Sequence, residues 1–311
     1  MKQRTQLVLR IVVSHFVLLI GLIISSIIIK KDAFLVLSIA QSVLFIIYFA
    51  GYWEFFGLRF KRFFCALIQF LLLAILAWKI YFQIYLEVNL NLIIPLGVIQ
   101  LYLLVELIKI LLVIFKKDAS AVEIEFPFRQ GTYLITDGGN SKTSRLMNYH
   151  YYFPTHKKNN TNNSMLYATD IVKIHTDKPS FFPELNDNYS IFGEKVYSPM
   201  PGMVLKVVND IPDNNPYSGN YPYNTGNTIV IKNADLYLLL GHLKQGSILV
   251  NEGDTIKAND LIATAGNSGW TERPHLHMQL IKSQSHNYWK GQGISVLFNN
   301  RNLYKNRLIK I

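Results

Sequence analysis

Four long apolar stretches occupy the first 115 residues of the chain, and they restrict its possible folds more than any other feature. Each reaches the roughly 20 residues that an α-helix needs to cross a bilayer. They cover residues 7–29, 33–53, 63–86 and 92–115. The third contains Lys79, and a charged side chain is costly inside a bilayer. The sequence therefore predicts an N-terminal α-helical transmembrane bundle of three to four spans.

The positive charge of the chain is concentrated in this apolar part. Of 31 Lys and Arg and 20 Asp and Glu in the whole chain, residues 1–117 hold 12 basic and 4 acidic ones. Basic loops tend to stay on the cytoplasmic side, so the basic residues near the N-terminus and in residues 59–62 favour a cytoplasmic N-terminus. Four spans would then leave the C-terminal part inside the cell, whereas three would place it outside. The number of spans and the sidedness stay open at this point.

The composition changes after Lys117. Gly, Asn, Pro, Tyr and Ser become common, and short apolar runs alternate with turn residues, as in GMVLKVV, NTIVIK and LYLLLGHL. This pattern is typical of short strands, and no amphipathic helix of three turns is expected from residue 120 onward. The sequence predicts a transmembrane domain at residues 1–117 and a mainly antiparallel β domain at residues 118–311. No basic stripe with interleaved aromatic residues occurs there, so nucleic acid is not an expected partner.

Two polar segments interrupt the strand pattern, at residues 154–164 and 209–227. Long loops on a β scaffold often carry binding residues, and disorder is the alternative. The chain has one cysteine, Cys65, inside an apolar run. An intrachain disulfide and a metal site of several cysteines are therefore excluded.

The strongest chemical signal is the segment PHLHMQL at residues 274–280, which contains His275 and His277. Side chains two apart in a strand project from the same face. Two such imidazoles suit a zinc site, either as two ligands or as a ligand beside an acid–base group. A His-x-His pair also occurs on surfaces without a metal, but here it follows a Gly-rich turn and a proline.

With its neighbours, this segment resembles the core of the lysostaphin/LytM-type zinc peptidases, and the resemblance covers residues 196–280. In that family a strand carries a Tyr and then a His-Leu pair. A Gly-Asp turn, a Gly-Asn-Ser/Thr-Gly loop and Pro-His-Leu-His follow. This chain reads YLLLGHLKQGSILVNEGDTIKANDLIATAGNSGWTERPHLH, with the same pieces in the same order. The resemblance implies a lysostaphin/LytM-like fold for the β domain.

The resemblance also implies that an upstream His and Asp complete a zinc site with His277. The compact His-x-x-x-Asp form of the family is absent, because Leu166 stands four residues before Asp170. Some members instead show Asn-x-His and, after a variable loop, Tyr-Ala-x-Asp. NYH at residues 148–150 and YATD at residues 167–170 match that variant and assign His150 and Asp170 as ligands. His156 is the rival ligand.

Two further histidines, His275 and His242, have catalytic roles by the same resemblance. They would handle the proton of a zinc-activated water and stabilise the oxyanion. Which of the two is the general base stays open. All five residues of the family's site have candidates here.

The sequence thus predicts a membrane-anchored, Zn²⁺-dependent metalloendopeptidase that hydrolyses peptide bonds in peptidoglycan cross-bridges or stems. The lipid bilayer and peptidoglycan, or another peptide substrate, are the expected partners, and no protein partner is indicated. The expected location is the cell membrane, multi-pass, with the peptidase domain outside the cytoplasm. The alternatives are a peptidase that processes a secreted peptide or a membrane protein, and an inactive peptidase-like module of a membrane complex.

Overall fold

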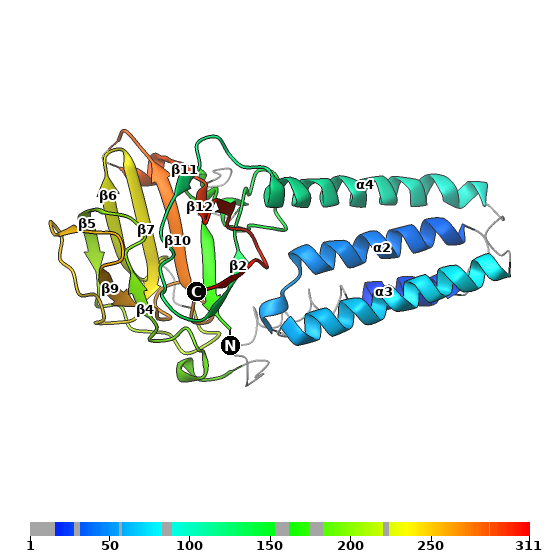
Figure 1. The fold of residues 1–311 in the computed structure, drawn as a ribbon, viewed down its shortest axis with the longest axis horizontal. Coiled ribbons are helices and arrows are strands. Elements are labelled where there is room, and N and C mark those ends of the chain that lie inside the picture. The colour runs from blue at the N-terminus through cyan, green and yellow to red at the C-terminus, as the bar shows by residue number, and fades with distance from the viewer. Residues whose placement is uncertain are drawn as a thin grey trace. The chain divides into compact units, whose positions relative to one another are not determined.

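The computed structural model describes eight segments of the chain: residues 16–27, 32–55, 58–82, 89–152, 162–174, 183–219, 224–285 and 287–311. The described residues divide into two compact units, one ending at Leu112 and one of residues Val113–Ile311. The first is helical and the second consists of β-strands and loops (Figure 1).

Long apolar helices make up the first unit. Their bounds are Phe16–Ile27, α2 Ala33–Ala50, the short 3₁₀ helix η1 Trp53–Phe55, α3 Leu58–Tyr81 and α4 Leu90–Phe115. Among the described residues, two helices are long and apolar enough to cross a membrane, Arg59–Tyr81 and Asn91–Phe115. The other two apolar helices are shorter as described, so the prediction of three to four spans stays a prediction.

Polar side chains link the helices of this unit to one another. Gln41 Nε2 on α2 donates a hydrogen bond of 2.9 Å to Gln69 Oε1 on α3. Gln100 Nε2 on α4 donates one of 3.0 Å to Ser42 Oγ on α2. Such bonds between apolar helices are common where water is excluded, because an unpaired amide there is costly.

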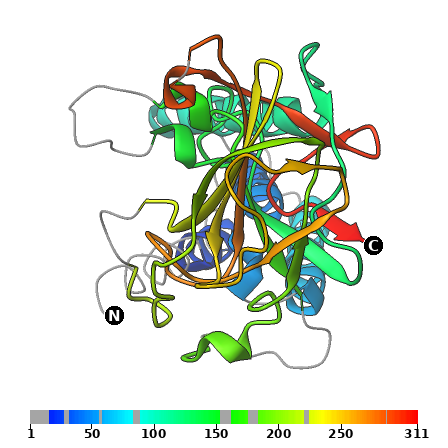
Figure 2. The same cartoon turned by 90° about the vertical axis from the view of Figure 1, so that its left-hand side faces the viewer.

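The second unit is built on one large antiparallel sheet. Its nine strands are ordered β14-β2-β3-β10-β7-β6-β5-β8, and β11 pairs with β10. These strands are β2 Thr132–Asp137, β3 Thr169–Lys173, β5 Gly202–Val208, β6 Asn227–Asn233, β7 Leu236–Leu243, β8 Thr255–Ile256, β10 Leu276–Lys282, β11 Gln292–Ile294 and β14 Leu308–Lys310. All pairings within it are antiparallel. The strands β6, β7 and β10 lie side by side (Figure 1), and Figure 2 shows the loops around them.

Smaller pairings complete the unit. The remaining strands are β1 Val122–Glu123, β4 Lys195–Tyr197, β9 Leu261–Thr264, β12 Val296–Phe298 and β13 Arg301–Asn302. Strands β4 and β9 pair antiparallel, and β1 pairs parallel with β12. The described helices after α4 are single 3₁₀ turns: η2 His150–Tyr152, η3 Asn163–Met165, η4 Asn186–Asn188 and η5 Tyr288–Lys290. The prediction of a mainly antiparallel β domain is therefore confirmed.

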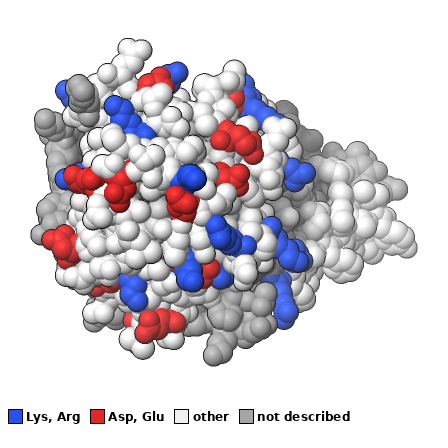
Figure 3. Space-filling view, turned by 60° about the vertical axis from the view of Figure 1, so that its left-hand side comes forward, with Lys and Arg blue, Asp and Glu red and all other residues white. Residues whose placement is uncertain are grey.

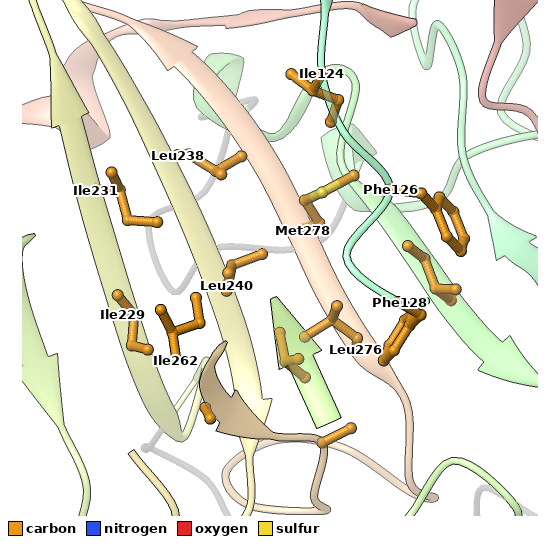
Figure 4. Close-up of a cluster of buried hydrophobic side chains, with 14 of the residues drawn as sticks. Ile124, Phe126, Phe128, Ile229, Ile231, Leu238, Leu240, Ile262, Leu276 and Met278 are labelled. Atoms are coloured by element: carbon orange, nitrogen blue, oxygen red, sulfur yellow. The ribbon is translucent and has the colours of Figure 1, made fainter. Parts of the chain in front are cut away.

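The main hydrophobic core lies on one face of the large sheet. Alternate residues of neighbouring strands point into it, among them Ile229, Ile231, Leu238 and Leu240 (Figure 4). On β10 the core residues are Leu276, Met278 and Leu280. Because side chains alternate along a strand, the residues between them, His277 and Gln279, project from the opposite face.

The predicted polar loop at residues 209–227 is held in place where it is described. Asn214 Nδ2 donates hydrogen bonds to Asn267 O (2.8 Å) and Gly269 O (2.6 Å). Asp213 Oδ1 accepts one of 2.6 Å from Asn267 N. The other predicted loop, at residues 154–164, lies mostly outside the described residues.

On the face of the molecule in Figure 3, acidic and basic side chains are interspersed.

Candidate metal centre

Three residues distant in the sequence converge in the β domain. His150 lies in η2, Asp170 on β3 and His277 on β10, and one potential ligand atom from each lies within 4.8 Å of the other two. Asp170 and His277 are direct partners in the register of β3 and β10. The distance from Asp170 Oδ2 to His150 Nε2 is 3.2 Å, and that from Asp170 Oδ1 to His277 Nδ1 is 2.9 Å. Two imidazoles and one carboxylate are a donor set that Zn²⁺ accepts.

Asp170 is the negative group of this cluster. Burial raises the pKa of its carboxyl, but His150 and His275 outweigh that effect and hold the pKa well below its usual range. The carboxylate is therefore ionised at neutral pH, as a metal ligand must be.

Asn148, which is fully buried, orients His150. Its Oδ1 accepts hydrogen bonds from His150 N (3.1 Å) and His150 Nδ1 (2.8 Å). Its Nδ2 donates to the carbonyl oxygens of Gly139 and Ala168, each at 2.9 Å. Since an oxygen acceptor requires a proton on Nδ1, the lone pair of the neutral ring lies on Nε2, the nitrogen that faces Asp170. The rival ligand His156 lies outside the described residues.

In His277 the two ring nitrogens have the opposite contacts from those in His150. Its Nε2 lies 3.0 Å from Gln279 Oε1, whereas its Nδ1 faces Asp170. His150 and His277 therefore each present one nitrogen to Asp170, while the other nitrogen meets an amide oxygen. Outer hydrogen bonds of this kind orient metal-binding histidines, so the residues present fit a zinc ion.

The two histidines with expected catalytic roles lie beside this cluster. The ring centroids of His242 and His275 are 4.7 Å apart, and those of His242 and His277 are 5.8 Å apart. His275 Nε2 lies 3.6 Å from Asp170 Oδ1. The structure thus brings together all five residues named from the sequence: His150, Asp170, His242, His275 and His277.

Backbone carbonyl oxygens orient both of these rings. His242 Nδ1 lies 2.8 Å from Ser268 O, and His275 Nδ1 lies 2.9 Å from Arg273 O. The proton of each neutral ring is therefore on Nδ1, and Nε2 is free to accept one. Burial lowers the pKa of both side chains, that of His242 well below its ordinary value. Both rings are neutral at neutral pH, and a neutral imidazole with a free nitrogen can act as a base.

The backbone at His242 is unusual for a strand. Its φ is 59°, in the left-handed region that L-residues enter at a cost of roughly 1–2 kcal/mol. Two hydrogen bonds hold it there, from His242 N to Thr225 O (2.7 Å) and from Gly266 N to His242 O (2.9 Å). The His242 ring lies near His275 at this irregular end of β7.

Sequence reasoning gave no role to four polar residues around the cluster. Asn148 and Gln279 contact its histidines. Asp137 on β2 is the register partner of Asp170, and the buried Lys305 Nζ lies 3.6 Å from Asp137 Oδ1. Asn148 and Gln279 each carried a readable signal, since Asn148 is part of the Asn-x-His motif and Gln279 is two residues from His277 on the same strand. The others arrive through loops or a distant strand pairing.

Comparison with known proteins finds similarity over part of the chain. Residues 188–289 match the model of peptidase family M23. A curated relative, the peptidoglycan DD-endopeptidase ShyA of Vibrio cholerae serotype O1, is 33% identical over 89 residues, which are 29% of this chain and 18% of that protein. The chain therefore spans less than a fifth of the length of that relative.

Solved structures give more distant similarities. Lysostaphin from Staphylococcus simulans is 21% identical with a TM-score of 0.28, and the match covers 41% of each chain. A zinc-containing peptidase from Vibrio cholerae is 23% identical with a TM-score of 0.32, over 56% of this chain and 39% of that one. The matched range includes His242, His275 and His277 but not His150 or Asp170, which are candidate ligands by the resemblance of their motifs and by their convergence with His277.

Proposed function

We propose that the chain is a membrane-anchored zinc metallopeptidase, and the match of residues 188–289 to the model of peptidase family M23 supports this proposal. One observation carries the proposal: His150 Nε2, Asp170 and His277 Nδ1 converge. The other nitrogen of each ring contacts a side-chain amide oxygen. A zinc ion held by these three residues would polarise the scissile carbonyl and acidify a water molecule.

The protein's own side chains would then move the protons. His275 and His242 each offer an unprotonated Nε2 and a fixed Nδ1–H, so either can accept a proton from the attacking water and pass it to the leaving amine. A ring that has gained a proton also stabilises negative charge on the substrate oxygen. Ionised Asp170 lies close enough to His275 to stabilise that positive charge.

Peptidoglycan is the proposed substrate, at the peptide bonds of its cross-bridges or stems. The support is the curated relative, which is described as a peptidoglycan DD-endopeptidase. Peptidoglycan lies outside the cytoplasmic membrane, so the proposal includes an extracytoplasmic β domain.

The membrane anchor is proposed from the surface of the helices. Phe63, Phe70 and Ile94 are 67%, 67% and 72% exposed, and other large apolar residues of α3 and α4 are exposed as well. Soluble proteins rarely expose apolar surface on this scale, and a bilayer would cover it. We therefore retain the multi-pass anchor of three to four spans as part of the proposal.

The test is incubation of the full chain, purified in detergent, with peptidoglycan, followed by mass analysis of the released fragments. New peptide ends are expected with the zinc-loaded wild type and not with His277→Ala. Zinc binding without cleavage would favour a peptidase for a secreted peptide or membrane protein. A wild type that binds no zinc would favour an inactive interaction module.

A further inference from the structure

We propose that Gln279 is a positioning residue that selects Nδ1 of His277 as its metal-binding nitrogen. The inference rests on the proposed zinc site and concerns a residue outside the ligand and catalytic set. Gln279 would act only through His277.

The first support is the hydrogen bond between the two side chains. Gln279 Oε1 lies 3.0 Å from His277 Nε2. Both residues are almost completely buried, at 1% and 2% exposure, so water does not compete for this bond. An amide oxygen can only accept, and the bond therefore requires a proton on Nε2. Nδ1 lies 2.9 Å from Asp170 Oδ1, and a zinc ion bound by both groups would meet the lone pair of Nδ1 once Nε2 carries the proton.

The second support is that the rest of the Gln279 amide stabilises nothing in the part of the chain that the structure describes. Its Nε2 is buried there without a hydrogen-bond partner. A buried, unpaired donor destabilises a fold. An apolar side chain of the same length would avoid that cost, so the contribution of the amide is the acceptor that it gives to His277.

Asn148 makes the same kind of bond to His150 but cannot be tested as cleanly. Its Nδ2 also joins the backbone at Gly139 and Ala168, so a substitution would disturb the fold together with the ligand. The two amides select opposite nitrogens, Nε2 of His150 and Nδ1 of His277. Gln279 is the member of the pair whose effect on the metal can be separated from its effect on folding.

The experiment compares two substitutions in the full chain, purified in detergent. Gln279→Met keeps the length of the side chain and removes the acceptor, whereas Gln279→Glu keeps an acceptor oxygen. Met278→Leu is the control, since Met278 lies on the same strand and points into the core on the opposite face. Zinc affinity is measured by competition with a chelator, and the Tm is measured on the metal-free protein.

Gln279→Met is expected to bind zinc about 10–100-fold more weakly than the wild type, as is typical when an outer partner of a ligand is lost. Its metal-free Tm should equal or exceed that of the wild type, because an unpaired buried donor has been removed. Gln279→Glu and Met278→Leu should bind zinc within a few-fold of the wild type. If Gln279→Met does not fold, Gln279→Leu takes its place.

Two results would overturn the inference while leaving the zinc site intact. One is wild-type zinc affinity in Gln279→Met. The other is equal weakening in Gln279→Met and Gln279→Glu with a lowered metal-free Tm in both, which would mean that Gln279 only packs. Absence of zinc binding by the wild type would overturn the inference and the proposed function together.

Discussion

At the scale of single residues, the centre is organised by what each histidine ring meets on its outer side. Side-chain amide oxygens of Asn148 and Gln279 meet the two proposed ligands. Backbone carbonyl oxygens meet the two proposed catalytic rings, His242 and His275. Each of these oxygens favours a proton on the ring nitrogen that it meets. The two pairs of histidines differ in this outer contact, and their proposed roles can be tested separately by substitution.

Substitution of a ligand should remove the metal. His277→Ala and His150→Ala are each expected to abolish stoichiometric zinc binding, since only two protein ligands would remain. Metal content is measured on the purified full chain, where the wild type should hold about one zinc per chain. His156→Ala is the matched control and should keep its zinc. Loss of zinc in that variant, with retention in His150→Ala, would exchange the two assignments.

Substitution of a catalytic ring should leave the metal in place. His275→Ala and His242→Ala are expected to retain zinc but to lose about 10²–10⁴-fold in kcat, the usual contribution of a positioned acid or base. Zinc content and turnover are measured on the same preparation. If His275→Ala loses its zinc, then His275 rather than His277 is the ligand of the pair.

The metal-free protein should depend on pH in two windows. Burial disfavours the charged form of His150, but Asp170 outweighs it and raises the pKa of His150 above its ordinary value of about 6.5. This contribution to stability is fully present below about pH 6.5 and is lost as the pH rises through the raised pKa. The pKa values of His242 and His275 are lowered in the folded protein. Below about pH 6.5 the unfolded chain therefore binds more protons at these two residues than the folded chain, and the stability of the fold decreases.

We therefore expect the Tm of the metal-free protein to pass through a maximum near the ordinary pKa of histidine. The increase in Tm caused by zinc should grow toward higher pH, because zinc displaces the proton of His150. Thermal unfolding with chelator and with zinc across this range measures both effects. His150→Gln should remove the decline on the alkaline side, and a decline of unchanged size in that variant would contradict the assignment.

At the scale of the elements, the alternating side chains of β10 contribute both to the hydrophobic core and to the candidate metal centre. Leu276, Met278 and Leu280 enter the core, and His277 and Gln279 lie on the opposite face, where His277 contacts Asp170. The alternation was readable in the sequence, and the predicted apolar runs coincide with β5, β6, β7 and β10. The pairing of β3 with β10 was not readable, because 107 residues separate Asp170 from His277.

The core face of the sheet should be sensitive to truncation. Leu240→Ala removes a fully buried side chain in the middle of β7 and is expected to lower the free energy of unfolding by about 2–5 kcal/mol. Leu249→Ala is the matched control, since Leu249 is 63% exposed and its truncation should cost about 0.5 kcal/mol or less. Chemical denaturation of the metal-free chain measures both, and equal losses would place Leu240 outside the core.

At the scale of the whole molecule, the proposed substrate requires the β domain to face outward. We expect a protease added to intact, wall-stripped cells to remove this domain without permeabilisation of the membrane. The basic residues near the N-terminus argue for the opposite side if all four apolar stretches cross. Survival of the domain until the membrane is permeabilised would place it in the cytoplasm and would exclude peptidoglycan as its substrate.

The sequence alone determined the two-part organisation, the strands of the β domain and the identity of the histidine pair. These features depend on local patterns: apolar length, alternation and a motif of adjacent residues. The family resemblance named His150 and Asp170 as candidate ligands, but only the tertiary structure showed that they converge with His277 and revealed the contacts of Asn148, Gln279, Asp137 and Lys305. The physical reason is that a metal centre needs donor atoms within a few ångströms, and in an antiparallel sheet that proximity is set by strand order and register between segments distant in the chain.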